Sequence, residues 1–162
     1  MRQTYIAQVK AHDNYKLEVK IDYPEKSDGI VIFCHGSGPN TYDNPREIEG
    51  KHFNLFADEF CRRSLAFCRW NTRGCAVSNH PPDFVAIDRA GYETYCPATS
   101  IQDIITVKNY VKALPQFRCA KILLMGISEG ATLAPFAAVQ CDDIAGLLLA
   151  GFSYGNMRDT LN

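Results

Sequence analysis

The sequence has little net charge, no long apolar segment and no apolar stretch at its N-terminus. Its 17 Lys and Arg residues nearly balance 18 Asp and Glu residues, and the formal net charge of −1 gives no general attraction to phosphate backbones or anionic lipids. No segment approaches the roughly 18 consecutive apolar residues that cross a membrane, and the N-terminus lacks the apolar core of a signal peptide. We therefore expect a cytoplasmic protein with neither a nucleic-acid nor a membrane partner.

The sequence also lacks any C-x-x-C pair, although it has seven cysteines. Cys61, Cys68 and Cys75 are seven residues apart, but the surrounding patterns place them in a helix, a strand and a loop, without the paired spacing of structural zinc sites. An odd number of cysteines in mostly apolar stretches indicates reduced thiols that pack in the interior. We expect no disulfide, no metal site and no cofactor. The seven are Cys34, Cys61, Cys68, Cys75, Cys96, Cys119 and Cys141.

Length and patterning predict one α/β domain over residues 1–162. Residues 5–10 and 15–22 alternate apolar with polar side chains across a turn, which is typical of an antiparallel hairpin. The chain then alternates apolar, branched strand segments with helical spacing, which predicts parallel strands joined by right-handed crossover helices. The expected strands cover 29–34, 66–70, 121–126 and 144–152, and the expected helices cover 53–63, 99–114 and 131–139. Thr99 or Ser100 is the expected cap of the second helix.

The motif Gly126-Ile127-Ser128-Glu129-Gly130 lies between a predicted strand and a predicted helix. A G-x-S-x-G sequence in that context is typical of a nucleophilic serine on a sharp turn, where glycines allow the strand and helix to pass closely. The following helix directs free N–H groups and the positive end of its dipole at the serine oxygen. An ordinary glycine-rich turn with a capping serine remains the alternative.

A second loop, His35-Gly36-Ser37-Gly38, follows the first expected parallel strand. Its position at the carboxyl end of a sheet strand is where open α/β sheets bind ligands. We expect the backbone N–H of Ser37 to pair with the N–H of Glu129 in binding an oxyanion. The loop is not a phosphate loop, because neither G-x-G-x-x-G nor G-K-[ST] is present. His35 is expected to bind backbone rather than to act as a general base.

Three segments in order resemble landmarks of the α/β-hydrolase family, in its carboxylesterase-like and serine-aminopeptidase-like branch. They are the loop at 35–38, the segment 69–78 and the stretch 126–135, which is similar to G-x-S-E-G-x-x-x-A-P. The middle segment departs from the family pattern at Ala76, where glycine is usual. The resemblance covers residues 5–152 and implies a three-layer α/β sheet that stops after its sixth strand. It implies Ser128 as the nucleophile, with Ser37 and Glu129 as backbone oxyanion donors.

The remainder of a catalytic triad has no clear place in this chain. In the family the acid follows the seventh or sometimes the sixth strand and the histidine follows the eighth, but His12, His35, His52 and His80 all precede Ser128. Asp159 occupies the less common acid position, although a solvated tail is the favoured interpretation, and His80 is interpreted as a solvent-exposed loop residue. The activity of this chain alone is therefore an open question.

The family's strand order would make residues 144–152 an edge strand with no charge in it. Because natural sheets protect their edges, we expect this strand to pair with a continuation of the chain, with a separate second half or with another copy. The predicted function is a serine hydrolase that acts on a small-molecule ester, thioester or amide. The alternative is a degenerate, non-catalytic α/β-hydrolase-fold binding protein. A flavodoxin-like module is disfavoured by the hairpin and by the missing phosphate loop.

Overall fold

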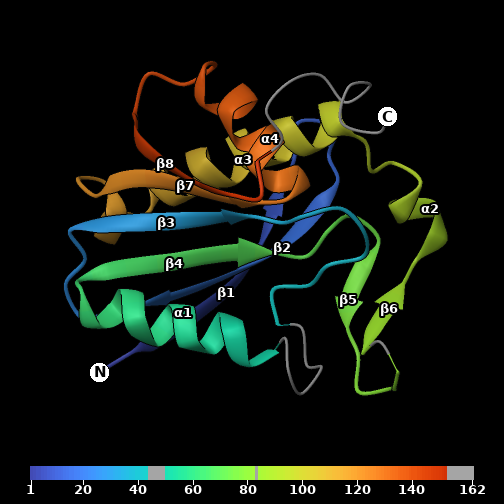
Figure 1. Cartoon of the computed structure of the whole chain (residues 1–162), viewed down its shortest axis with the longest axis horizontal. Helices are drawn as coiled ribbons and strands as arrows, with labels where there is room; N and C mark the ends of the chain where they lie inside the picture. The colour runs from blue at the N-terminus through green and yellow to red at the C-terminus, as the bar shows by residue number, and fades with distance from the viewer. Residues whose placement is uncertain (44–49, 83, 153–162) are drawn as a thin grey trace.

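The computed structural model describes residues 1–43, 50–82 and 84–152, which include a six-stranded mixed sheet (Figure 1). The N-terminal hairpin is antiparallel, its second strand is antiparallel to the next strand of the sheet, and the remaining pairs are parallel. The α/β class and the change from antiparallel to parallel pairing are thereby confirmed. In spatial order the strands are β1 (Gln3–Lys10), β2 (Lys16–Tyr23), β4 (Leu65–Trp70), β3 (Gly29–Cys34), β7 (Lys121–Ile127) and β8 (Ile144–Ala150).

Helices cover both faces of this sheet, so the fold has three layers. The helix α1 (Gly50–Arg62) packs on β4 and β2 on one face, while α3 (Pro97–Ala113) and α4 (Glu129–Ala138) lie on the other (Figure 1). All six residues of β3 are buried because the strand lies between the two helix layers. This explains the unbroken apolar sequence of that strand, which a half-exposed strand would not need.

The segment between β4 and α3 differs from the sequence prediction. It contains a two-stranded antiparallel sheet of β5 (Cys75–Val77) and β6 (Val85–Ile87), followed by the short helix α2 (Arg89–Tyr92). These elements lie beyond the carboxyl ends of β3 and β4, at the right of Figure 1. The placement of Cys75 in a loop was therefore wrong.

The start of α3 also corrects the prediction. Cys96, not Thr99 or Ser100, is the N-cap, and Pro97 occupies the first helical position, where its missing N–H costs no hydrogen bond. Thr99 lies in the first turn, and its hydroxyl accepts the backbone N–H of Cys96 at 3.0 Å. The helix begins earlier than its apolar periodicity indicates because capping, and not burial, decides where it starts.

Two buried arginines join elements that are distant in the sequence. The Arg69 guanidinium contacts Asp22 at 2.6 Å and Asp43 at 3.0 Å, whereas Arg73 donates to both carboxylate oxygens of Asp103 at 2.7 Å. Both arginine side chains are almost fully buried, and hydrogen bonding to Asp103 is the main cause that raises the pKa of Arg73. Arg73 therefore stays charged, and each arginine binds a carboxylate that is distant from it in the sequence.

The described residues contain no group of metal-ligating side chains and no helix long and apolar enough to cross a membrane. The seven cysteines are free, and Cys34 and Cys68 are fully buried. Burial raises the pKa of the Cys34 thiol to about 12, because the thiolate would have no solvation there. These two thiols act as small apolar groups in the interior.

The strand β8 lies at the edge of the sheet, as the sequence predicted. It pairs with β7 on one side, and its leucines are partly open to solvent, with 40% of Leu147, 44% of Leu148 and 37% of Leu149 exposed. The strand ends at Ala150, two residues before the predicted end. An apolar edge of this kind offers unpaired backbone groups to a further strand.

Candidate active site

Ser128 lies on a strained turn between β7 and α4. Its backbone has φ 56° and ψ −121°, a conformation that L-residues rarely adopt, and its side chain is exposed. The turn is held because a Cβ at Gly126 would lie 2.2 Å from the carbonyl oxygen of Gly130, which excludes any larger residue. The backbone N–H of Ser128 donates to the carbonyl oxygen of Ala150 at 2.9 Å and so fixes the turn against β8.

The helix α4 begins at Glu129, directly after this serine. The first N–H groups of a helix have no partner within the helix, and the dipole makes this end positive. The carbonyl oxygen of Ser128 already accepts the N–H of Ala131 at 3.0 Å. The turn therefore presents the exposed serine oxygen next to the N-terminus of a helix, where a developing negative charge is stabilised.

The loop that follows β3 lies against the same turn. A Cβ at Gly36 would be 3.3 Å from the Cβ of Ser128 and 3.9 Å from its Oγ, so a larger residue would push the loop away from the turn by a small amount. The side-chain amide of Asn40 donates to the carbonyl oxygens of Gly36 at 2.9 Å and Gly38 at 3.0 Å. Because Ser37 directly follows Gly36, the loop brings the second predicted donor to the same corner of the molecule.

His35 shapes this loop, as expected from the sequence. Its Nε2 donates to the carbonyl oxygen of Trp70 at 2.7 Å, and its ring packs edge-on against Phe33 and Phe53 at 5.1 and 5.7 Å. Desolvation lowers the pKa of His35 to about 4, so the ring is neutral at pH 7 and its Nε2 carries the proton. His80 is exposed beside Ser78, and Asp159 lies outside the described residues.

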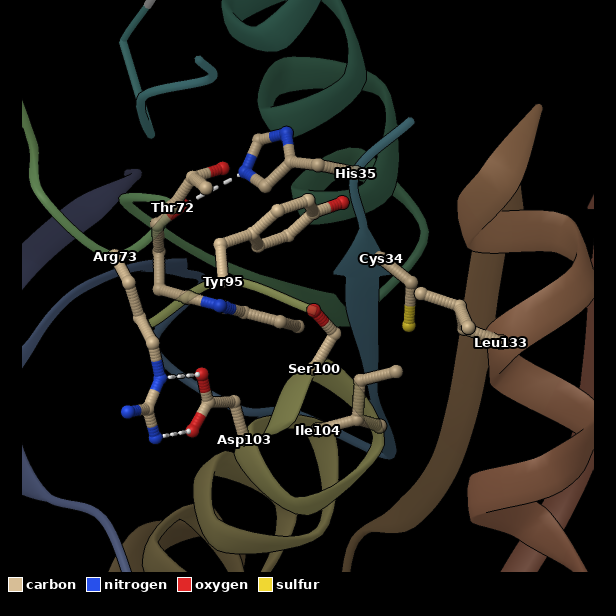
Figure 2. Close-up of a pocket in the computed structure, with 10 residues that line it drawn as sticks. Cys34, His35, Thr72, Arg73, Tyr95, Ser100, Asp103, Ile104 and Leu133 are labelled. Carbon is tan, nitrogen blue, oxygen red and sulfur yellow. Dashed lines mark hydrogen bonds and ion pairs between the residues drawn. The ribbon is translucent and has the colours of Figure 1, made fainter. Parts of the chain in front are cut away.

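Tyr95 is a neighbour of the turn that sequence reasoning missed. Its hydroxyl donates to the carboxylate of Glu129, and burial is the largest cause that raises the pKa of this phenol. Figure 2 shows Tyr95 beside His35 and Ser100 in a cavity of about 30 Å³, with the Arg73–Asp103 pair at its base. No local signal could have found this contact, because Tyr95 and Glu129 are 34 positions apart.

The comparisons with known proteins give structural matches only. No protein-family profile matches the sequence, and no curated protein matches it. A dienelactone hydrolase from Anabaena variabilis superposes with a TM-score of 0.65 and 18% identity over 90% of this chain. An esterase from Pyrococcus furiosus gives 0.63 and 17% over 89%, and an α/β serine hydrolase without a lid from Xanthomonas campestris gives 0.54 and 18% over 85%.

This chain spans about half the length of those proteins. It covers 62% of the dienelactone hydrolase, 49% of the esterase and 56% of the lidless hydrolase. The likeness to these three structures extends over 85% to 90% of this chain. The predicted fold is therefore confirmed, and the chain has an α/β-hydrolase fold.

Proposed function

We propose that this chain carries the nucleophile and the oxyanion hole of a serine hydrolase. The observation that supports this most strongly is the strained, exposed Ser128 at the N-terminus of α4, with Gly36 of the neighbouring loop beside it. Strain of this kind persists only where the surrounding structure enforces it, and it is common at catalytic nucleophiles. The substrate is a small carboxylic ester, thioester or amide.

In the proposed reaction the Oγ of Ser128 attacks the carbonyl carbon and forms a tetrahedral intermediate. The backbone N–H groups of Glu129 and Ser37 would donate to the oxygen that becomes negative, and the dipole of α4 adds to this stabilisation. The serine proton passes to a base as the bond forms, and the leaving group departs with a proton from that base. Water then attacks the acyl-enzyme while the same base takes its proton. The acid product leaves, and the base returns the proton to the Oγ of Ser128.

The base is proposed to come from outside the described part of the chain. His35 does not fit the role, because desolvation lowers its pKa to about 4, its ring is enclosed by aromatic side chains and its Nε2–H is donated to the carbonyl oxygen of Trp70. We propose that a further strand pairs with β8 and belongs to the segment that supplies the histidine. Support comes from the exposed leucines of β8 and from the greater length of the proteins that share the fold.

A test of the pairing is the self-association of the purified chain. Leu148→Lys places a charge on β8 and should reduce association, because charged side chains protect sheet edges. Leu55→Lys on α1, which is also exposed, is the matched control and should change little. Two results together would contradict the proposal. The wild-type chain would stay monomeric at high concentration, and no added segment that could pair with β8 would raise its free energy of unfolding.

A non-catalytic binding protein is the second candidate, because all four histidines precede Ser128 in the sequence. Labelling with a fluorophosphonate separates the two functions, since an unassisted serine hydroxyl is a poor nucleophile. We expect labelling that Ser128→Ala abolishes and that Ser78→Ala, in an exposed loop, leaves intact. Absence of labelling in the longest available form of the protein would favour the binding function.

A cytoplasmic location remains part of the proposal. It is supported by the seven free cysteines, two of which are fully buried, since thiols of this kind are typical of a reducing compartment. Fractionation of expressing cells with an antibody to the chain would test it, and recovery in a membrane or secreted fraction would contradict it.

A further inference from the structure

A second, larger pocket opens on the α1 side of the sheet, next to Ser128. Its volume is about 430 Å³, within the range of small-molecule sites. The residues that line it come from β3, the loop after β3, α1 and the end of β7. They are Phe33, His35, Gly36, Asn40, His52, Phe53, Phe56 and Ile127.

This pocket adjoins the proposed nucleophile on two sides. Gly36 forms part of its wall, and a Cβ there would lie 3.9 Å from the Oγ of Ser128. Ile127, which also lines it, immediately precedes that serine in the chain. A group that occupies the pocket would therefore belong to a molecule whose reacting carbonyl lies near Ser128.

The walls of the pocket are largely aromatic and are fixed by packing. The rings of Phe33 and Phe53 meet edge to face with centroids 5.2 Å apart, and Phe56 packs against Phe67 at 6.1 Å. The guanidinium of Arg69 lies 5.7 Å from the centroid of the Phe53 ring and is held there by its buried ion pair. Rings held in this way lose little further freedom when a ligand binds, which favours affinity.

Among the described residues the lining contains no Lys, Arg, Asp or Glu side chain, so these residues offer no carboxylate to a cationic ligand. The ring of His35 is neutral at pH 7 because desolvation lowers its pKa to about 4. An apolar cavity of about 150 Å³ holds one benzene ring, and this pocket is larger. Its chemistry and size fit an uncharged aromatic group of one or two fused rings, which can pack edge-on against the phenylalanines.

We propose that this pocket binds an uncharged aromatic portion of the substrate, so that the chain acts on aryl or arylacyl esters. The catalytic meaning of this site rests on the proposed function, whereas binding in the pocket does not need an active Ser128. The proposed hydrolase function and the proposed binding of an aromatic group can therefore fail separately.

The test is titration of the chain with 2-acetonaphthone, a neutral ketone that cannot be hydrolysed, followed by calorimetry and by the amide NMR shifts of Gly36 and Ile127. We expect saturable binding that shifts both amides. Phe56→Trp fills the pocket and should weaken binding about tenfold. Phe136→Trp makes the same change at an exposed site on α4 and should leave binding unchanged. A protonated naphthylmethylamine should bind about tenfold more weakly than the ketone, because none of the described lining residues carries a carboxylate to pair with its charge.

Ser128→Ala should keep ketone binding while it abolishes fluorophosphonate labelling. Retained binding with no labelling of the longest available form of the protein would support the pocket and count against the hydrolase. Absence of saturable binding, or equal effects of Phe56→Trp and Phe136→Trp, would overturn the pocket proposal whatever the labelling shows. Circular dichroism of each variant checks the fold, and the smaller change Ile127→Phe narrows the pocket if Phe56→Trp does not fold.

Discussion

Replacing Arg73 by methionine should destabilise the chain strongly. The guanidinium is 2% exposed, donates to both oxygens of Asp103 at 2.7 Å and also to Asp13, and lies 4.8 Å from the centroid of the Tyr15 ring. Methionine keeps much of the volume but leaves the carboxylate of Asp103, which is 3% exposed, without a cation. An unpaired buried charge of this kind costs about 3–5 kcal/mol of folding free energy.

A loss of that size is a large share of the total, since domains of this kind are stable by only about 5–15 kcal/mol. Urea unfolding followed by circular dichroism measures the loss. Arg89→Met is the matched control, because Arg89 is exposed and its pair with Glu93 contributes about 0.5 kcal/mol or less.

The double variant Arg73→Met, Asp103→Leu separates the lost charge pair from lost packing. It should recover most of the stability, because no buried charge remains uncompensated. A loss below about 1 kcal/mol in Arg73→Met, or a double variant no more stable than that single one, would refute the reasoning.

Three further predictions concern the neighbourhood of Ser128. Gly130→Ala should lower the free energy of unfolding by about 3 kcal/mol, because the new Cβ would lie 2.1 Å from the carbonyl oxygen of Cys34. Gly146→Ala should lower it less, because its Cβ meets only a flexible side chain at 3.1 Å. Urea unfolding compares the two variants. The free energy of unfolding should fall as the pH is lowered from about 6.5 to about 4, because the pKa of His35 is about 4 in the folded chain and that proton binds the unfolded chain more readily; in His35→Gln the pH profile should be flatter over this window. Ser128→Gly should raise thermal stability by about 1 kcal/mol through release of backbone strain, while it removes fluorophosphonate labelling; a lower melting temperature would count against the strain.

Features that depend on a few adjacent residues could be predicted from the sequence. The turn at Ser128 is one, because a G-x-S-x-G between an apolar strand and a helix leaves the backbone few alternatives. The buried strand Gly29–Cys34 is another, since an unbroken branched apolar run requires cover on both faces. By contrast, β5 and β6 have only three residues each and are partly exposed, so their side chains show no useful period.

The sequence by itself determined the fold class, the position of the turn at Ser128 and the apolar character of the β8 edge. These follow from hydrophobic periodicity and from glycines, which act over a few residues. Only the tertiary structure showed that Tyr95 contacts Glu129, that Arg73 joins Asp103, and that α1, β3 and β7 enclose an aromatic pocket beside Ser128. Those contacts join residues tens of positions apart, and their partners are chosen by strand order and helix packing, which no local pattern records.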